Sequence, residues 1–264
     1  MSPTQSVCLI TGASAGLGAA LAREFARRGH ALVLTARREA ELSALADEIA
    51  AEGHARPVVI AADLATPAGV AALAEALSRR ALEPAIVVNN AGFGLLGEAA
   101  SLDRARQLAM IDLNVRALTE LTLHWLDSVK RQRGGILNVA SVAGFLPGPG
   151  MAVYHATKAY VLSFSEAMHA ELKSEGVRVC ALCPGPVETE FFAQAGMPRD
   201  YFPDFMNRSP ERVAREGYEG FMAGHRVVVP GRPNRIMTLL PRLLPRAWML
   251  AMTGRRWRRA GRDG

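Results

Sequence analysis

Apolar residues along this chain fall into two alternating patterns. The first is a short, nearly continuous run of valine, isoleucine, leucine and alanine, which is typical of a strand buried on both faces of a parallel sheet. Seven such strands are predicted, over Val7–Thr11, Ala31–Thr35, Pro57–Ala61, Ala85–Asn89, Gly135–Ala140, Val177–Cys183 and Arg226–Val229.

The second pattern repeats its apolar positions every three to four residues and predicts helices in the intervals between the strands. These helices are expected over Gly16–Arg28, Glu39–Ala51, Pro67–Arg79, Tyr154–Ser174 and Pro210–Ala223, with a longer one over Leu102–Lys130 that is broken near Met110. Strands that alternate with helices form a parallel sheet with helices on both faces. The sequence therefore predicts a single doubly wound α/β domain with about seven strands.

The length and composition suit one large α/β domain. The chain has 264 residues, half of them hydrophobic, and three cysteines, Cys8, Cys180 and Cys183, which all fall in apolar runs. Cys180 and Cys183 form a C-x-x-C pair, but no second pair and no paired histidines accompany it. We therefore expect three core residues, no metal site and a reducing cytoplasm. Neither a signal peptide nor an apolar stretch long enough to span a membrane is predicted.

Positive charge is concentrated at the carboxyl end. From Gly231 onward the chain carries nine arginines and one acid, so the remaining 22 basic and 24 acidic residues give residues 1–230 a net charge of −2. We divide the chain into a domain, 1–230, and a basic, apolar tail, 231–264. Because the domain itself is slightly acidic, nucleic-acid binding is not expected.

The tail allows two interpretations. Its apolar stretch, Ile236–Met252, is interrupted by Pro241 and Pro245 and is followed by arginines around Trp257. Apolar residues beside clustered arginine and tryptophan could lie on an anionic membrane surface. Alternatively, the stretch packs over the pocket or a subunit interface and ends in a solvated basic segment, which is the interpretation we favour.

A glycine-rich turn joins the first predicted strand to the first helix. Its glycines, Gly12, Gly16 and Gly18, allow a tight turn and a close approach of the backbone, around Ser14 and Leu17, to a pyrophosphate. The helix that follows offers free N–H groups and a partial positive charge to the same phosphates. The turn therefore predicts a dinucleotide site.

The same turn contains the pattern G-x-S-x-G around Ser14, which would be the nucleophile elbow of an α/β-hydrolase. Against this alternative, an elbow on the first strand would have no preceding strand to supply an oxyanion loop. Gly18 also fits a phosphate-binding turn better.

Two arginines follow the second predicted strand. A dinucleotide fold places an acid near this position to bind the adenosine 2′-hydroxyl, but this chain has Arg37 and Arg38 there. A guanidinium suits a 2′-phosphate, so NADP(H) is expected in preference to NAD(H). The alternative is that both arginines simply begin a solvated helix.

Tyr154 and Lys158 stand one helical turn apart, and Ser141 precedes them. An unperturbed tyrosine has a pKa of about 10, and a nearby cation favours the phenolate. We therefore expect Lys158 to lower the pKa of Tyr154, which would act as a general acid and base while Ser141 holds a substrate oxygen.

Taken together, these motifs resemble the short-chain dehydrogenase/reductase family from about Val7 to Val229. The residues that carry the resemblance are, in chain order, Thr11–Gly18, Asn89–Gly92, Asn114, Ser141, Tyr154, Lys158 and Pro184–Thr189. The resemblance implies a Rossmann-type fold, a catalytic set of Asn114, Ser141, Tyr154 and Lys158, and a homodimer or homotetramer in which the two long helices pair across a twofold axis.

The resemblance also implies how a cofactor is held. Asp63, beside Leu64, would hydrogen-bond the adenine, and Asn90, Ala91 and Gly92 would line the adenosine ribose. Lys158 would bind the nicotinamide ribose. The segment that contains Pro184, Gly185, Val187 and Thr189 would lie at the nicotinamide, with Val187 and Thr189 at its carboxamide. Asn114 would stabilise a kink in its helix and position a water that leads from Lys158 to solvent.

Each of these residues also has a plain structural explanation. Asn89 and Asn90 could form an ordinary turn at a strand end, Asp63 could cap the next helix, and Asn114 could be a polar helix residue.

The function that these features predict is NADP(H)-dependent exchange of a hydride with a carbonyl or secondary alcohol. Substrate contacts are expected from Ser141, Tyr154 and residues 93–96, 143–151 and 190–206. The last range carries Phe191, Phe192, Met197, Tyr201, Phe202 and Phe205. Few charges accompany them, so an apolar or amphipathic substrate is expected, unless these aromatics only pack the loop onto the core. The non-catalytic alternative is a dinucleotide sensor that has lost turnover.

Overall fold

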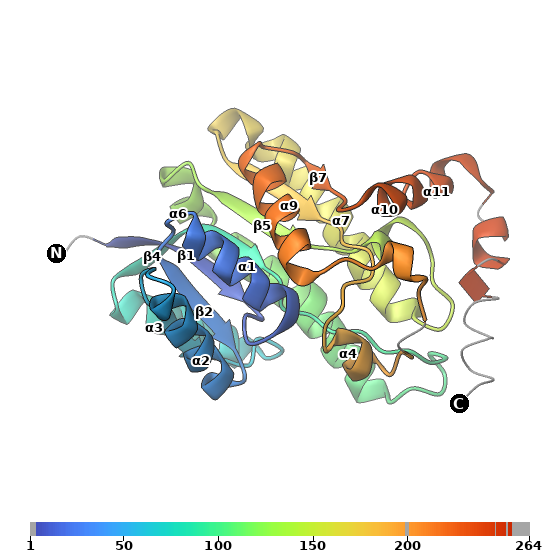
Figure 1. Cartoon of the computed structure of the whole chain (residues 1–264), viewed down its shortest axis with the longest axis horizontal. Helices are drawn as coiled ribbons and strands as arrows, with labels where there is room; N and C mark the ends of the chain where they lie inside the picture. Colours follow the sequence, from blue (N-terminus) through green and yellow to red (C-terminus); the bar gives the residue numbers. More distant parts are fainter. Residues whose placement is uncertain (1–3, 199–200, 246, 252, 255–264) are drawn as a thin grey trace.

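The computed structural model describes residues 4–198, 201–245, 247–251 and 253–254. Its centre is a seven-stranded parallel sheet in the order β3-β2-β1-β4-β5-β6-β7 (Figure 1). The strands are β1 (Gln5–Thr11), β2 (Leu32–Ala36), β3 (Val58–Ala61), β4 (Leu82–Asn89), β5 (Gly135–Val139), β6 (Arg178–Leu182) and β7 (Val227–Val228). The predicted doubly wound Rossmann-type domain is therefore confirmed.

Strand β4 begins three residues before the predicted start at Ala85, because Pro84 lies within the strand and pairs with β1. The register between β1 and β4 shifts between Val7, which faces Pro84, and Cys8, which faces Ile86. A proline has no N–H to donate to a ladder, so it is tolerated where the pairing is irregular.

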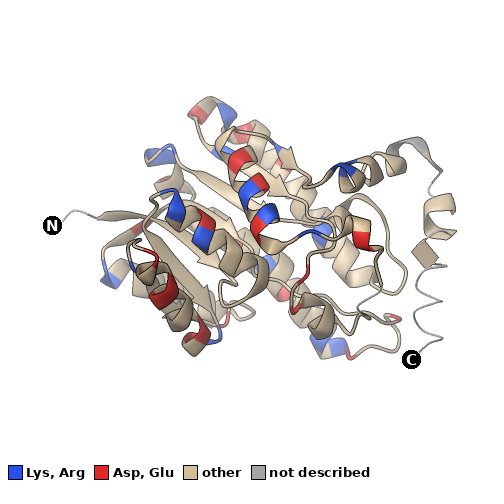
Figure 2. Cartoon of the chain, viewed as in Figure 1, with Lys and Arg blue, Asp and Glu red and all other residues tan. Residues whose placement is uncertain are grey.

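Helices cover both faces of the sheet (Figure 1). One face packs against α1 (Gly16–Arg27), α2 (Glu39–Ala51) and α9 (Pro210–Met222), and the other against α3 (Pro67–Arg79), α5 (Leu118–His124), α6 (Leu126–Arg131) and α7 (Ala152–Leu172). Phe25 and Phe221 are fully buried on the first face, and Leu73 and Leu121 on the second. Charged residues of both signs occur along α1, α2 and α9, whereas the strands carry few (Figure 2).

The long helix predicted from Leu102 to Lys130 is divided near Met110, as expected, and once more further along. Helix α4 (Arg104–Ile111) leads into a six-residue π-helix, η1 (Asp112–Ala117), and a second break at Trp125 separates α5 from α6. A π-helix is rare and is frequent at functional sites. In this chain it contains Asn114, in agreement with the distortion expected there.

The segments after β6 and β7 contain short helices. The loop predicted from Pro184 to Ser209 includes α8 (Phe191–Ala195) and a 3-10 turn, η4 (Asp204–Met206), and the tail begins with α10 (Arg232–Met237) and α11 (Leu240–Leu243). Residues 247–251 and 253–254 are also helical. Within the described ranges, no helix has both the length and the apolar character that crossing a bilayer requires.

The strand order changes direction between β1 and β4, whose chain neighbours lie on opposite sides. Ligands of open α/β sheets bind in the crevice outside the carboxyl ends of the strands at such a switch point. The glycine turn follows β1 and Asn90 follows β4, so the topology places both at this crevice.

Candidate active site

A cavity of about 810 Å³ opens at the carboxyl ends of the strands. Every residue predicted to bind cofactor lines it, although these residues come from six separate segments of the chain. They are Gly12, Ser14, Gly16, Leu17, Gly18, Arg37, Arg38, Asp63, Leu64, Asn90, Ala91, Gly92, Tyr154, Lys158, Pro184, Gly185, Val187 and Thr189.

The glycine turn is packed too tightly for side chains. Gly12 has φ +66°, and a Cβ on Gly18 would lie 2.2 Å from the Gly12 carbonyl oxygen. Asn90 holds the turn from β4 by donating its Nδ2 hydrogens to the carbonyls of Thr11 (2.9 Å) and Gly12 (3.2 Å). The amino end of α1 therefore faces the cavity across a backbone that phosphate oxygens can approach closely.

Arg38 spans the opening beside this turn. Its Nη2 lies 3.3 Å from both the Ser14 hydroxyl and a Glu190 carboxylate oxygen, and its Nε lies 3.6 Å from Glu41. Both Arg37 and Arg38 are exposed at the cavity wall. Two guanidinium groups therefore lie at the cavity wall, and that of Arg38 reaches both a hydroxyl of the glycine turn and the carboxylates of Glu41 and Glu190.

Ser14 does not have the surroundings of a hydrolase nucleophile. In the described part of the chain, its hydroxyl accepts hydrogen bonds from Arg38. Since Arg38 is a permanent cation, it cannot take a proton from the serine. The hydrolase interpretation of G-x-S-x-G is therefore wrong.

Asp63 and Thr66 make separate hydrogen bonds in the turn before α3. The Asp63 carboxylate accepts a hydrogen bond from the Ala65 N–H (3.1 Å), while Thr66 caps the helix by accepting from the Gly69 N–H (3.1 Å). The helix cap is therefore Thr66, not Asp63 as the structural alternative supposed. Asp63 is exposed at the cavity, where its second carboxylate oxygen is available to a ligand.

Asn114 lies behind the cavity wall. Its Nδ2 donates to the Phe93 carbonyl (3.0 Å) and to the Thr157 hydroxyl (3.1 Å), and its Oδ1 accepts from the Phe93 N–H (3.1 Å). A Cβ on Gly92 would lie 2.9 Å from Asn114 Oδ1 and 3.6 Å from Lys158 Nζ. The asparagine therefore joins η1 to the strand end and to the helix that carries Tyr154 and Lys158.

Ser141, Tyr154 and Lys158 meet at the cavity. Just after β5, Ser141 accepts a hydrogen bond from the Ala143 N–H (3.1 Å), and its hydroxyl donates to the Pro184 carbonyl (3.5 Å). Tyr154 and Lys158 lie on one face of α7, with the Lys158 Nζ 5.9 Å from the centroid of the Tyr154 ring. Lys158 donates to the Val139 carbonyl (2.8 Å), which fixes the ammonium beneath the ring.

The expected acidification of Tyr154 is wrong. Burial raises the pKa of Tyr154 to about 12, although the hydrogen bond from Ser141 opposes this. Burial also lowers the pKa of Lys158 to about 8. Loss of solvation disfavours both charged forms more than the lysine favours a phenolate. Tyr154 is therefore a neutral phenol at neutral pH, which is the form that donates a proton.

The other end of the cavity is apolar, as predicted. Phe191 lies 5.5 Å from Tyr154 between ring centroids, and Met197 and Phe202 line the same wall. Phe205, however, is 64% exposed and lies outside the cavity. The aromatics thus serve both of the roles considered, because they line the cavity and also pack the loop onto a buried cluster.

His155 adds a polar group to this wall. Its Nδ1 lies 2.8 Å from the Leu146 carbonyl, and burial lowers its pKa. At neutral pH the ring is therefore uncharged, and it packs against Gly148, where a Cβ would clash with it.

Some lining residues gave no signal in the sequence. Arg106, Ala109 and Leu113 lie on one face of α4 and η1, and Met237 and Thr253 come from the tail. The first three have helical spacing, but such spacing also describes a core face. Thr253 donates to the Pro147 carbonyl (3.4 Å), so the described tail packs against the pocket.

Metal ligation is not indicated by the residues that the structure describes, which hold no group of three or more histidine, cysteine, aspartate or glutamate side chains able to bind an ion. The three cysteines are buried and free, as expected of core residues.

Comparison with known proteins agrees with this geometry. Residues 6–199 match a family model described as short chain dehydrogenase. The chain is 38% identical over 188 residues to sulfoacetaldehyde reductase 2 of Chromohalobacter salexigens, a match that covers 70% of this chain and 74% of the relative.

Solved structures extend the similarity to the tail. A short-chain dehydrogenase from Sphingobium yanoikuyae in complex with NADPH is 33% identical, with a TM-score of 0.78 over 96% of this chain and 94% of that one. The 3-ketoacyl-(acyl-carrier-protein) reductase of Brucella melitensis, complexed with NADH, is 31% identical, with a TM-score of 0.75 over 86% and 96%.

Proposed function

The chain belongs to the short-chain dehydrogenase family and is an oxidoreductase, and we propose that it uses NADP(H) to reduce the carbonyl group of an apolar or amphipathic compound. The observation that carries the proposal is the meeting of Ser141, Tyr154 and Lys158 in the cavity that the glycine turn also lines. A dinucleotide held by that turn and a carbonyl held by the phenol would share one site.

The chain's residues account for each part of the cofactor. Gly12–Gly18 and the amino end of α1 would receive the pyrophosphate, and Arg37 and Arg38 the 2′-phosphate. Asp63 would bind the adenine, and Lys158 the nicotinamide ribose. When bound, the reduced dinucleotide supplies a hydride to the carbonyl carbon.

The protein's own contribution is the proton and the position of the oxygen. Ser141 and Tyr154 would hydrogen-bond the carbonyl oxygen, and Tyr154 would donate its phenolic proton to that oxygen as the hydride adds to carbon. Lys158 and Asn114 would then return a proton to Tyr154 through a water.

The substrate class follows from the apolar wall. Phe191, Met197 and Phe202 surround the space beyond Tyr154, and His155 is neutral at neutral pH. An apolar ketone or aldehyde suits this part of the wall. A dinucleotide sensor without turnover is the second candidate, but it would have no use for a buried proton donor.

Self-association as a homodimer or homotetramer is part of the proposal. The outer faces of α4, α5 and α7 carry exposed apolar side chains, namely Leu108, Ile111, Leu123 and Tyr160. Burial of such faces in a second copy is the arrangement that the family resemblance implies.

Replacing Tyr154 by phenylalanine tests the proposed chemistry. Tyr154→Phe should lower kcat about 10²–10⁴-fold while NADPH still binds, because only the proton donor is removed. The measurement is the decay of NADPH absorbance across a panel of apolar ketones and aldehydes. Tyr160→Phe is the matched control, since Tyr160 lies on the same helix and its hydroxyl lies 2.9 Å from that of Thr119, outside the cavity. Unchanged turnover in Tyr154→Phe would refute the role, and binding without turnover in the unaltered chain would favour the sensor.

Replacing Arg38 tests the cofactor preference. Arg38→Ala should raise the Kd for NADPH at least tenfold, since a hydrogen bond to a charged group is worth about 1.5–3 kcal/mol, and should change the Kd for NADH less than about twofold. Fluorescence titration measures both values. Arg56→Ala removes an exposed arginine that pairs with Asp47 away from the cavity and serves as the control. Equal losses for NADPH and NADH would contradict the preference.

A further inference from the structure

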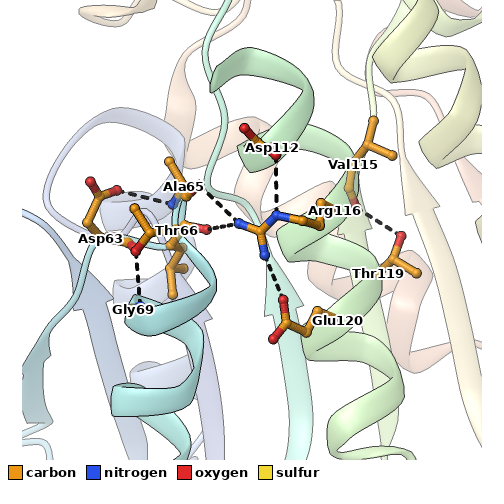
Figure 3. Close-up of polar contacts among 10 residues, drawn as sticks. Asp63, Ala65, Thr66, Gly69, Asp112, Val115, Arg116, Thr119 and Glu120 are labelled. Atoms are coloured by element: carbon orange, nitrogen blue, oxygen red, sulfur yellow. Dashed lines mark hydrogen bonds and ion pairs between the residues drawn. The ribbon is translucent and has the colours of Figure 1, made fainter. Parts of the chain in front are cut away.

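The guanidinium of Arg116 bridges two segments that line or support the cavity but are far apart in the sequence. One is the turn Asp63–Thr66, which follows β3 and precedes α3, and the other is the π-helix η1. Figure 3 shows Arg116 reaching from η1 across to the backbone of this turn.

All three nitrogens of the guanidinium are engaged. Nη2 donates to the carbonyl oxygens of Ala65 (3.0 Å) and Leu64 (3.4 Å), Nη1 lies 2.7 Å from a Glu120 oxygen, and Nε lies 3.3 Å from an Asp112 oxygen. The planar fork of arginine can serve acceptors in these different directions at once, whereas the ammonium of a lysine cannot reproduce the arrangement.

On the turn, these bonds complete a small network. The Ala65 N–H is held by the Asp63 carboxylate, and the Thr66 N–H and hydroxyl both donate to the Asp63 carbonyl (3.2 and 3.1 Å). The local bonds therefore satisfy the carbonyl of Asp63, while the carbonyls of Leu64 and Ala65 accept from Arg116. Asp63, Leu64 and Ala65 line the cavity, so a shift of this turn would move the cavity wall.

On the helix, Arg116 spans the π-segment. Asp112 is its first residue and Glu120 lies in the next α-helical turn, so the two carboxylates stand four residues before and four after the arginine. Asn114, two residues before Arg116, holds both the N–H and the carbonyl of Phe93 as well as Thr157. The position of Asn114 therefore depends on a helical segment of unusual geometry that Arg116 ties to its neighbours.

We propose that Arg116 is a positioning residue that couples the adenosine end of the cofactor site to Asn114 at the catalytic end. This inference rests on the proposed function. Arg116 itself does not line the cavity and acts through the turn on one side and through η1 on the other. An adenosine that fixes the turn would therefore also restrict the motion of the helix that carries Asn114. Because such coupling is reciprocal, restricting that helix would in turn favour adenosine binding.

If Arg116 only stabilised the fold, its loss would lower stability more than it weakens cofactor binding. The side chains of Arg116, Asp112 and Glu120 are 29%, 47% and 40% exposed, and exposed ion pairs contribute little to stability. Loss of the guanidinium should therefore affect cofactor binding and turnover more than it affects folding. Arg79, which pairs with Glu75 on α3 at the same i,i+4 spacing and away from the cavity, is a matched control.

The experiment compares Arg116→Ala, Arg116→Lys and Arg79→Ala in the full chain. Arg116→Ala should raise the Kd for NADPH about tenfold, as expected for the loss of charged hydrogen bonds, and should lower kcat at saturating NADPH several-fold. Arg116→Lys should recover part of the affinity, and Arg79→Ala should match the unaltered chain. A change of less than about twofold in both Kd and kcat for Arg116→Ala, or equal losses in Arg79→Ala, would overturn the proposal.

Hydrogen–deuterium exchange without cofactor gives a readout that does not need the proposed function. Arg116→Ala should speed amide exchange both in residues 63–66 and in 112–117, and Arg79→Ala in neither. Unchanged exchange in either segment would overturn the bridge. If the unaltered chain bound neither NADPH nor NADH, the proposed function would fail, and that result would be distinct from the exchange result.

Discussion

Burial determines the protonation of both members of the Tyr154/Lys158 pair. The sequence places a cation one turn from a phenol, which by itself favours the phenolate, but both side chains lie in the interior and both charged forms lose solvation. At neutral pH the pair is therefore a neutral phenol and an ammonium whose pKa is lowered to about 8, rather than a phenolate and an ordinary ammonium. Spacing alone indicates that two groups can interact, and only their surroundings determine which charge state results.

The lowered pKa of Lys158 predicts how stability depends on pH. Its folded pKa of about 8 lies below the ordinary value of 10.5, so unfolding takes up a proton between these values. The buried ammonium destabilises the fold below pH 8, and this penalty disappears as the pH rises through the unfolded value. Lys158→Met should therefore be more stable than the unaltered chain at pH 7 by about 3 kcal/mol, and the gap should close toward pH 10.

Urea unfolding from pH 7 to pH 10 measures this gap. Tyr154 has the opposite effect: because its pKa is raised in the folded chain, the fold becomes less stable as the pH rises above 10. Lys158→Met retains Tyr154, so the difference between the two chains reports the lysine. Lys173→Met, at an exposed position just after the same helix, is the control for the loss of a lysine side chain. A gap that stays constant across this range would contradict a low pKa for Lys158.

At the scale of elements, the turn between β1 and α1 needs glycine because other backbone lies against it, and not only because of its φ angles. Gly12 and Gly53 both have positive φ, but a Cβ on Gly53 would meet nothing within 4 Å, whereas one on Gly12 or Gly18 would meet backbone. Gly53 follows the end of a helix in open space, whereas Gly12 and Gly18 bring the backbone of one element against that of another. Of these three glycines, only Gly12 and Gly18 line the cavity.

Gly18→Ala should therefore lose cofactor binding. Its Cβ would lie 2.2 Å from the Gly12 carbonyl and 2.5 Å from Asn90 Nδ2, so the turn must move. We expect a loss of about 1–3 kcal/mol in stability, as for other overpacked sites, together with at least a tenfold higher Kd for NADPH. Gly53→Ala should cost about 1 kcal/mol through backbone strain and leave the Kd unchanged. Calorimetry and titration separate the two effects, and equal NADPH affinity in both variants would contradict this account.

At the scale of the whole molecule, the described part of the tail is integrated into the domain. Asn234 is fully buried and donates to the carbonyls of Met206 (3.3 Å) and Pro230 (3.1 Å), while Met237 and Thr253 line the cavity. This supports the interpretation that the segment packs over the pocket. Much of the charge that suggested a membrane surface, including Arg246 and residues 255–264, lies outside the described residues.

A chain that ends at Pro230 tests the tail. It should unfold at a temperature several degrees lower, because it loses buried side chains, and should show a higher KM for apolar ketones because part of the cavity wall is gone. Trp248→Ser, at a position that is 64% exposed, should change neither value. Sedimentation with anionic vesicles should recover the full and shortened chains equally. Selective recovery of the full chain would instead favour membrane contact.

The sequence by itself determined the architecture and most of the candidate site. Alternation of apolar runs with helical periodicity requires a parallel sheet, and in a parallel sheet the turns that follow the strands meet at one edge. This is why Gly12, Asn90 and Ser141, which are far apart in the chain, could be assigned to one cavity. Local motifs also identified Tyr154 and Lys158, because one helical turn fixes their spacing.

Tertiary structure alone decided what depends on burial and on long-range contact. The pKa directions of Tyr154 and Lys158, the exposure of Phe205, the π-helix around Asn114 and the bridge made by Arg116 all arise from packing between elements. A residue's local sequence carries its chemistry and its periodicity, but not the solvent it loses or the distant backbone it meets. Those quantities exist only once the chain has folded, since they are properties of neighbours that the sequence does not place side by side.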